Sequence, residues 1–195
     1  MSKENKELIV GLDIGTSKIV AIVAELTADG KLNILGIGSQ ESKGLKKGMV
    51  VNIEATVNAI SRAIQEAELL SLCKVKSVYT GIAGSHIKSK DSDGMVVVRE
   101  KEVTQLDVQR AIEAAQATPI SADDRLLHTL VQEFIVDGQD GVKEPIGMDA
   151  KRLEVRVQIV TGAVTSVQNI VKCVHRCGLE VADLVLQPLA SGDAV

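Results

Sequence analysis

The residues best suited to chemistry lie in one short stretch near the N-terminus of the chain. Asp13 is the only acidic residue in an apolar run that covers residues 8–14, and a second apolar run, residues 19–23, begins shortly afterwards. Between the two runs lie Gly15, Thr16, Ser17 and Lys18. This pattern predicts a strand, a tight turn and a second strand, with the polar atoms gathered at the bend.

The chemistry that this turn could perform is the binding of an anion such as a polyphosphate. A turn of glycine and hydroxyl residues offers backbone N–H groups and side-chain hydroxyls, and Lys18 adds a positive charge. Asp13 would be costly to bury unless it served a metal ion, a charge partner or water. The alternative is an ordinary hairpin turn with a lysine on its surface. The sequence contains no Walker A loop, no Rossmann glycine motif and no Gly-x-Ser-x-Gly nucleophile.

Composition limits the classes of protein to which the chain can belong. It has 195 residues, a formal net charge of −4, one Phe, one Tyr and no Trp. Aromatic platforms for single-stranded bases are therefore excluded, and no long basic stripe could follow a phosphate backbone, so we expect no nucleic acid partner. The lysines of one small cluster, Lys43, Lys46 and Lys47, are expected to form a solvated loop.

Cysteine use and the N-terminus predict a cytoplasmic location. Cys73, Cys173 and Cys177 are an odd number and fit a reducing compartment, in which we expect them to be structural thiols. Residues 1–7 are charged and lack the apolar core of a signal peptide. No apolar run reaches the roughly 18 residues that a membrane-spanning helix needs.

Hydrophobic periodicity predicts an α/β domain with a mixed sheet and helices, interrupted by a small α+β module. The expected elements of the domain are three antiparallel strands within residues 8–40, a loop at 42–48, a helix at 53–72, a strand at 75–83, a helix at 163–177, a strand at 179–186 and the start of a helix at 188. The expected elements of the module are a short strand at 95–98, a helix to 117 that opens with a Thr104–Asp107 capping box, a strand at 126–136, a loop at 138–150 and a strand at 152–161.

Several sequence strings resemble known families. Residues 11–18, Gly-Leu-Asp-Ile-Gly-Thr-Ser-Lys, resemble the first phosphate motif of the actin, Hsp70 and sugar-kinase superfamily. Six further strings together resemble the bacterial cell-division family FtsA: Ser42-Lys-Gly-Leu-Lys-Lys-Gly48, Gly81-Ile-Ala-Gly-Ser-His-Ile87, Glu102-Val-Thr-Gln-Leu-Asp-Val108, His128-Thr-Leu-Val-Gln-Glu-Phe134, Pro145-Ile-Gly-Met148 and Cys177-Gly-Leu-Glu-Val181. As a set they are far more specific than the phosphate motif alone, although the family often has proline where Val131 stands.

This resemblance implies a split actin-like fold, which is related to ribonuclease H. Residues 1–83 and 162–195 would form subdomain 1A, and residues 84–161 would form subdomain 1C. By similarity, the turn from Gly15 to Lys18 would hold the phosphates of ATP, and Asp13 would orient Mg²⁺ through water.

The resemblance also implies a role as a scaffold rather than an enzyme. The full-length protein would self-polymerise through contacts between 1A and 1C, and would link FtsZ to the cytoplasmic face of the inner membrane at the division site. It would receive the cytoplasmic segment of FtsN near the 1A–1C junction. ATP hydrolysis would be slow or incidental, and no catalytic residue is implied.

Several parts that the resemblance implies are absent from this sequence. They are the second, Asp-x-Gly-Gly-Gly phosphate loop, the second lobe with its FtsZ site and the C-terminal amphipathic membrane helix. We therefore expect a fragment of a longer protein that binds ATP weakly by itself. Two other interpretations stay open: an ATPase or kinase of the Hsp70 or sugar-kinase type, which shares the first loop, and a pilus assembly adaptor like PilM, which has a similar actin-like plan.

Overall fold

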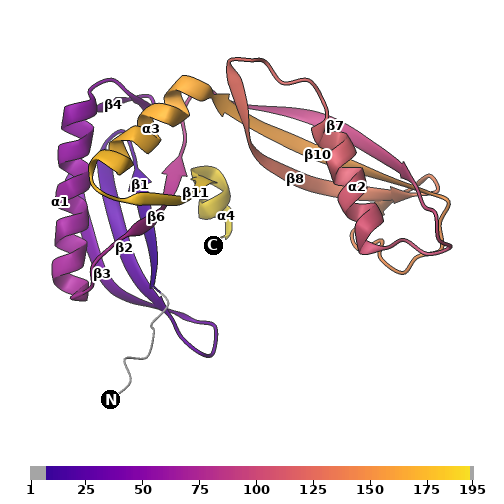
Figure 1. Ribbon diagram of the computed structural model, residues 1–195, viewed down its shortest axis with the longest axis horizontal. Coiled ribbons are helices and arrows are strands. Elements are labelled where there is room, and N and C mark those ends of the chain that lie inside the picture. The colour runs from indigo at the N-terminus through magenta and orange to yellow at the C-terminus, as the bar shows by residue number, and fades with distance from the viewer. Residues whose placement is uncertain (1–7, 194–195) are drawn as a thin grey trace. The chain divides into compact units, whose positions relative to one another are not determined.

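The computed structural model describes residues 8–193, which divide into two compact units. Within these residues, unit 1 comprises the chain up to His86 and from Val164 onward, and unit 2 comprises Ile87–Ala163 (Figure 1). The boundaries expected from the sequence, 83/84 and 161/162, lie two or three residues away. Each unit has its own sheet, and the expected class of a mixed α/β domain interrupted by an α+β module is confirmed.

Unit 1 is built on a five-stranded mixed sheet. Its order is β11 (Glu180–Leu186), β6 (Ser77–Ile82), β1 (Leu8–Ile14), β2 (Lys18–Leu26) and β3 (Leu32–Glu41). The first three strands in the sequence form the predicted antiparallel meander. Strand β6 pairs in parallel with both β1 and β11, so the carboxyl ends of these three strands meet at one edge.

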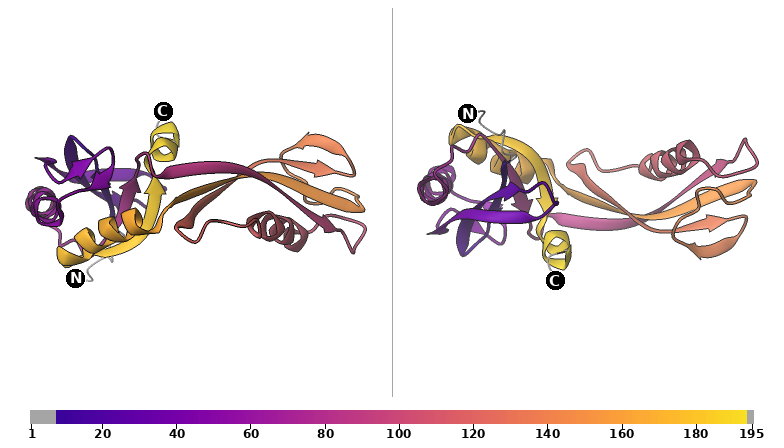
Figure 2. Two further views of the ribbon diagram at one scale, coloured as in Figure 1. Left: turned by 90° about the horizontal axis from the view of Figure 1, so that it is seen from above. Right: turned by 90° about the horizontal axis from the view of Figure 1, so that it is seen from below.

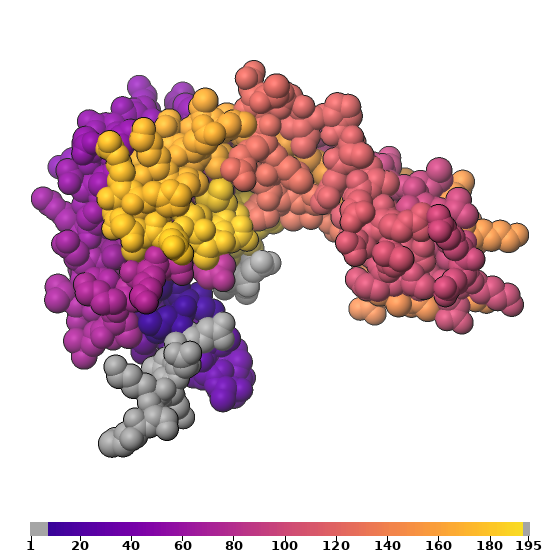
Figure 3. Space-filling view, viewed as in Figure 1, coloured from indigo at the N-terminus to yellow at the C-terminus, as the bar shows by residue number. Residues whose placement is uncertain are grey.

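Two helices cover one face of this sheet. Helix α1 (Ile53–Ser71) begins where Asn52 accepts a hydrogen bond from the Ala55 N–H at 3.0 Å, as its sequence predicts. Helix α3 (Val164–Arg176) packs beside it, and the two helices form a continuous surface in the space-filling view (Figure 3). Gly38 allows the close approach of α1, because a Cβ there would lie 1.9 Å from the Ala63 carbonyl oxygen.

The other face of the same sheet carries an exposed apolar row. Tyr79, Gly11, Ile22 and Ile37 lie opposite one another on four neighbouring strands. The two isoleucines and the tyrosine are each more than a third exposed. This row is therefore left open to solvent by the described residues, although Gln187 of the C-terminal segment packs on the same face at Asp13 and Gly81.

Unit 2 is a four-stranded antiparallel sheet with one helix. The strand order is β7 (Ile87–Val97), β10 (Arg152–Ala163), β8 (Asp124–Val136) and β9 (Gln139–Val142), and helix α2 (Gln105–Gln116) lies along one face (Figure 2). The core consists of apolar side chains from the strands and from the inner side of α2.

Two expectations for unit 2 need correction, and one is confirmed. The short strand expected at 95–98 is the end of β7, which pairs with β10 along its whole length, from Ile87 opposite Gly162 to Val97 opposite Arg152. Part of the loop expected at 138–150 is strand β9. The capping box is confirmed, since Thr104 and Asp107 each bond the other's backbone N–H at the start of α2.

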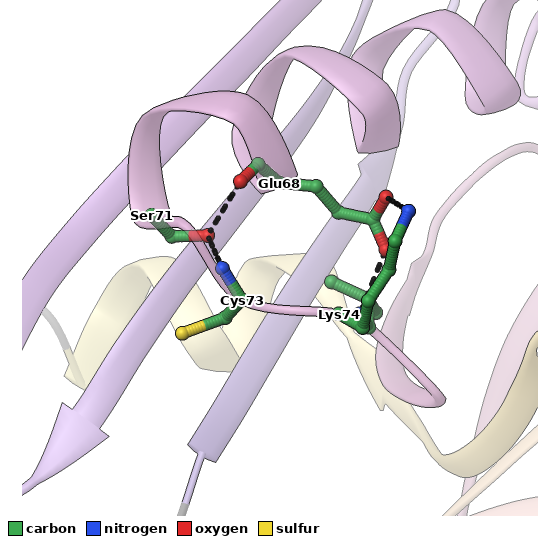
Figure 4. Close-up of polar contacts among 5 residues, drawn as sticks. Glu68, Ser71, Cys73 and Lys74 are labelled. Atoms are coloured by element: carbon green, nitrogen blue, oxygen red, sulfur yellow. Dashed lines mark hydrogen bonds and ion pairs between the residues drawn. The ribbon is translucent and has the colours of Figure 1, made fainter.

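Helix α1 ends beside a shallow hollow of about 420 Å³, at the end of the sheet where β6 begins; it is lined by Gln65, Glu68, Leu69, Leu72, Cys73 and Lys74. Leu72 ends the helix in the left-handed conformation, with φ 55°. Glu68 accepts hydrogen bonds from Lys74 Nζ at 2.6 Å and from the Val75 N–H at 2.8 Å (Figure 4). These polar groups serve the chain reversal after the helix, and the hollow holds no set of residues with evident chemistry.

Candidate phosphate-binding turn

The turn predicted to bind anions connects β1 to β2 and is held by three hydrogen bonds. The Gly15 N–H donates to the Lys18 carbonyl at 3.0 Å, and the Ser17 carbonyl accepts from the Ser42 N–H at 3.0 Å. The Thr16 hydroxyl oxygen accepts from the Gly48 N–H at 3.1 Å. Gly15 suits this tight bend, because a Cβ there would lie 2.8 Å from the Lys18 carbonyl oxygen.

The tip of the turn presents donors to solvent. Thr16, Ser17 and Lys18 are exposed. Within residues 8–193, the backbone N–H groups of Thr16 and Ser17 donate to no protein acceptor. Two adjacent amides without a protein acceptor, the Ser17 hydroxyl, the Thr16 hydroxyl proton and the Lys18 ammonium group therefore lie at one exposed bend, which is a suitable arrangement for a phosphate group.

Asp13 is the second-last residue of β1 and is separated from Gly15 of the turn by Ile14 alone. Its carboxylate accepts a hydrogen bond from the side-chain amide of Gln187. Partial loss of water around Asp13 raises the pKa of its carboxyl group, and the positive charge of Lys18 opposes that rise. The Asp13 residue is exposed, so its carboxylate is accessible to a ligand.

Three neighbouring parallel strands bring this site together. Asp13 is opposite Gly81 of β6, and Gln187 is the first residue of α4 (Gln187–Asp193), directly after β11. A Cβ on Gly81 would lie 3.0 Å from Cγ of Gln187 and 3.5 Å from Asp13 Oδ1, so glycine at this position leaves room for their contact. Crevices at the carboxyl ends of parallel strands are common ligand sites in α/β sheets.

Sequence reasoning missed two residues of this site. Gln187 has no local motif, and it meets Asp13 from 174 positions away. Gly48 was predicted only to end the loop at 42–48, whereas in the structure its N–H donates a hydrogen bond to the Thr16 hydroxyl oxygen. Both contacts depend on pairing between distant segments, which no spacing rule for short motifs can detect.

Comparison with known proteins identifies the family of the chain. Residues 84–161 match the family described as the SHS2 domain inserted in FTSA. The Cell division protein FtsA of Pseudomonas aeruginosa is 55% identical over 194 residues, which cover 100% of this chain and 46% of that protein. The FtsA of Escherichia coli K12 is 41% identical over 191 residues, which cover 98% of this chain and 46% of that protein. The chain belongs to the FtsA family. It spans about half the length of the curated relatives it matches.

A solved structure has a similar fold. A chain of the PilM–PilN type IV pilus biogenesis complex superposes with a TM-score of 0.64 at 16% identity, over 93% of this chain and 48% of that one. At this identity the likeness shows a shared actin-like fold and nothing about function. The FtsA relationship therefore rests on sequence, and the PilM likeness supports the architecture of both units.

The residues at and beside the turn could take part in binding Mg²⁺ in one way, with Asp13 as a single carboxylate. Within residues 8–193, no group of three or more His, Cys, Asp or Glu side chains could enclose a metal ion. Mg²⁺ commonly keeps several waters and takes one or two carboxylates plus phosphate oxygens. Asp13 fits that pattern as a single carboxylate beside a phosphate turn, whereas a metal cage made by the protein alone does not fit.

Two cysteines and one histidine outside the turn are buried or half-buried. Cys173 is buried in α3, and burial raises the pKa of its thiol to about 11. The Cys177 thiol donates to the Cys173 carbonyl at 3.2 Å. His86 is buried without a hydrogen-bond partner for either ring nitrogen, and burial lowers the pKa of its imidazole. Within residues 8–193, no helix is long and apolar enough to cross a membrane.

Proposed function

We propose that this chain supplies the first half of an ATP-binding cleft in an actin-like scaffold for cell division. The observation that carries the proposal is the turn at residues 15–18, where two unpaired amides, two hydroxyls and Lys18 lie beside Asp13. Membership of the FtsA family supports the cellular role, because the relatives are named as cell division proteins.

Each residue of the turn has a defined task in this proposal. The Thr16 and Ser17 amides donate to phosphate oxygens, and Lys18 neutralises their charge. Asp13 would help to hold Mg²⁺ through water, and the ion would supply charge compensation for the polyphosphate. The Gln187 amide fixes the carboxylate in place by donating to Oδ1.

We propose a scaffold with slow or incidental ATP hydrolysis rather than an enzyme. Within residues 8–193, no histidine or carboxylate side chain is hydrogen-bonded to residues 15–18, and we therefore propose no general base for this turn. The protein would self-polymerise through its two units, link FtsZ to the inner membrane and receive the cytoplasmic segment of FtsN. The FtsZ site and a membrane helix would lie in the part of the full-length protein that this chain does not cover.

Titration of the full-length protein with a fluorescent ATP analogue tests this proposal. We expect saturable, Mg²⁺-dependent binding that inorganic triphosphate competes away, and co-sedimentation of the protein with FtsZ filaments. Rapid phosphate release or transfer to a sugar would instead favour a kinase or an Hsp70-type ATPase. ATP binding without FtsZ co-sedimentation would favour an assembly adaptor of another system.

A further inference from the structure

A small hairpin contacts the phosphate-binding turn through one specific bond. Strands β4 (Leu45–Lys46) and β5 (Met49–Val50) are joined by Lys47 and Gly48, which have φ values of 51° and 76°. Positive φ at both central residues is what a tight type I′ hairpin turn requires. The Gly48 N–H of this bend donates to Thr16 Oγ1 at 3.1 Å, although the two residues are 32 positions apart.

The same hairpin is seated firmly on the segment that follows β6. A Cβ on Gly48 would lie 2.4 Å from the Ala83 carbonyl oxygen and 2.6 Å from Cα of Gly84. A Cβ on Gly84 would in turn lie 2.8 Å from the Lys47 carbonyl oxygen. Gly48 and Gly84 therefore lie at a close backbone contact that leaves no room for a side chain at either position. This contact fixes the position of the Gly48 N–H.

The bond to Gly48 decides how the Thr16 hydroxyl can be used. A hydroxyl has one proton to donate and accepts through its oxygen lone pairs. Because Gly48 occupies an acceptor position of Oγ1, the Thr16 proton is left for another acceptor. The exposed side of the turn is where a phosphate oxygen would provide that acceptor.

We propose that the β4–β5 hairpin is a positioning element that orients the Thr16 hydroxyl as a donor to polyphosphate. The inference rests on the proposed nucleotide function and adds to it a residue, Gly48, outside the phosphate turn. Coupling is reciprocal: if the hairpin orders Thr16 for the ligand, ligand binding must stabilise the hairpin by the same factor. The hairpin and residues 83–86 should therefore become more protected when the turn is occupied.

Hydrogen exchange of the full-length protein tests the bond itself before any ligand is added. In Thr16→Val, which keeps the side-chain shape but removes the acceptor, we expect the Gly48 amide to exchange about five- to tenfold faster, as one hydrogen bond predicts. Thr16→Ser, which keeps the hydroxyl, should restore the slow exchange. Unchanged exchange in Thr16→Val would overturn the inference.

Binding of Mg²⁺ with ATP, or with inorganic triphosphate alone, tests the positioning role. We expect Gly48→Ala to weaken both affinities at least about fivefold, through the loss of a correctly placed donor on Thr16. Gly30→Ala is the matched control, because Gly30 has φ 77° in the β2–β3 turn but nothing within 4 Å of an added Cβ. If Gly48→Ala does not fold, the positioning role is tested by the exchange of residues 45–50 instead, which ligand should slow in the wild type and in Thr16→Ser but not in Thr16→Val.

The possible failures are distinguishable. Equal affinities for ATP in the wild type, Thr16→Val and Gly48→Ala would overturn the positioning role alone. Wild-type protein that binds neither ATP nor triphosphate would overturn the proposed function, whatever the exchange of the Gly48 amide shows. Slower exchange of residues 45–50 and 83–86 on adding ligand, lost in Thr16→Val, would support both.

Discussion

The side-chain amide of Gln187 donates to Oδ1 of Asp13, which joins the residue that opens α4 to the end of β1. Strand β6 lies between their two strands, and its Gly81 leaves the space for this contact. The bond therefore reports that β11, β6 and β1 are in register. It also shows why the site is a property of the folded sheet and not of the turn alone.

Lys18 supplies the charge of the turn, so Lys18→Ala should weaken ATP binding by the full-length protein about tenfold, the value of one charge-assisted hydrogen bond. The side chain is exposed, and the melting temperature should stay within about 2 °C of the wild type, as for most surface changes. Isothermal titration and thermal unfolding measure the two effects. Lys31→Ala, in the exposed β2–β3 turn, is the control, and equal affinities in both variants would contradict the site assignment.

Asp13 should make stability depend on pH in an unusual direction. Its folded-state pKa is raised by partial loss of water, so the ionised carboxylate opposes folding, and this cost is removed as the pH falls through the folded pKa. Asp13→Asn should therefore raise the urea midpoint at pH 7, with a gain that shrinks near pH 4. Asp91→Asn, at an exposed position of β7, should change neither value. A lower midpoint for Asp13→Asn at pH 7 would show that the carboxylate stabilises the fold.

Local signals in the sequence predicted most of the elements. Asn52 and the Thr104–Asp107 pair marked the starts of α1 and α2, because capping chemistry depends on residues only three positions apart. Strand β7 was largely missed, since its first half, Lys-Ser-Lys-Asp-Ser-Asp at 88–93, has no apolar alternation. Those residues are a strand because β10 provides partners along the whole length.

The candidate site was predictable only in part for the same reason. The turn from Gly15 to Lys18 is contiguous, and its glycine, hydroxyls and lysine indicate anion chemistry directly. Gln187 and Gly48 reach it through the parallel sheet and through a hairpin, so their relevance appears only once the chain has folded. The exposure of Asp13 was likewise set by the edge of the sheet and not by the apolar residues beside it.

Gly38 should be among the most sensitive positions of unit 1. Gly38→Ala would place a Cβ 1.9 Å from the Ala63 carbonyl oxygen and push α1 off β3, at a cost of about 2–3 kcal/mol. Gly11→Ala, on β1 of the same sheet, meets nothing within 4 Å and should cost less than about 1 kcal/mol. Urea unfolding of both variants measures the difference. Equal losses would mean that α1 can move away freely.

Gly94 should be as sensitive to substitution in unit 2 as Gly38 is in unit 1, because a helix also packs closely against it. A Cβ there would lie 2.0 Å from the Ala111 carbonyl oxygen of α2. In Gly94→Ala we expect faster hydrogen exchange in β7, β10 and α2, while β1, β2 and α1 keep wild-type rates, because each unit has its own core. Uniform loss of protection across both units would show that they unfold as one.

The thiols should differ sharply in reactivity. Burial raises the pKa of Cys173 to about 11, so very little thiolate forms at pH 8. Iodoacetamide should therefore modify Cys73, which is half-buried after the end of α1, well before Cys173. Peptide mass mapping over time gives the order. Early modification of Cys173 in the folded protein would contradict its placement in the core.

The pairing of Ile87 with Gly162 has a consequence for the order in which the chain can fold. Ser77 of β6 must find Glu180 of β11 across the entire insertion, and the entropy lost in closing such a long loop slows folding. Once β7 has paired with β10 in unit 2, the start of β7 and the end of β10, which lead into unit 1, already lie side by side. A folded unit 2 therefore lowers the entropy cost of bringing β11 to β6. We expect unit 2 to fold before the sheet of unit 1 is completed during synthesis.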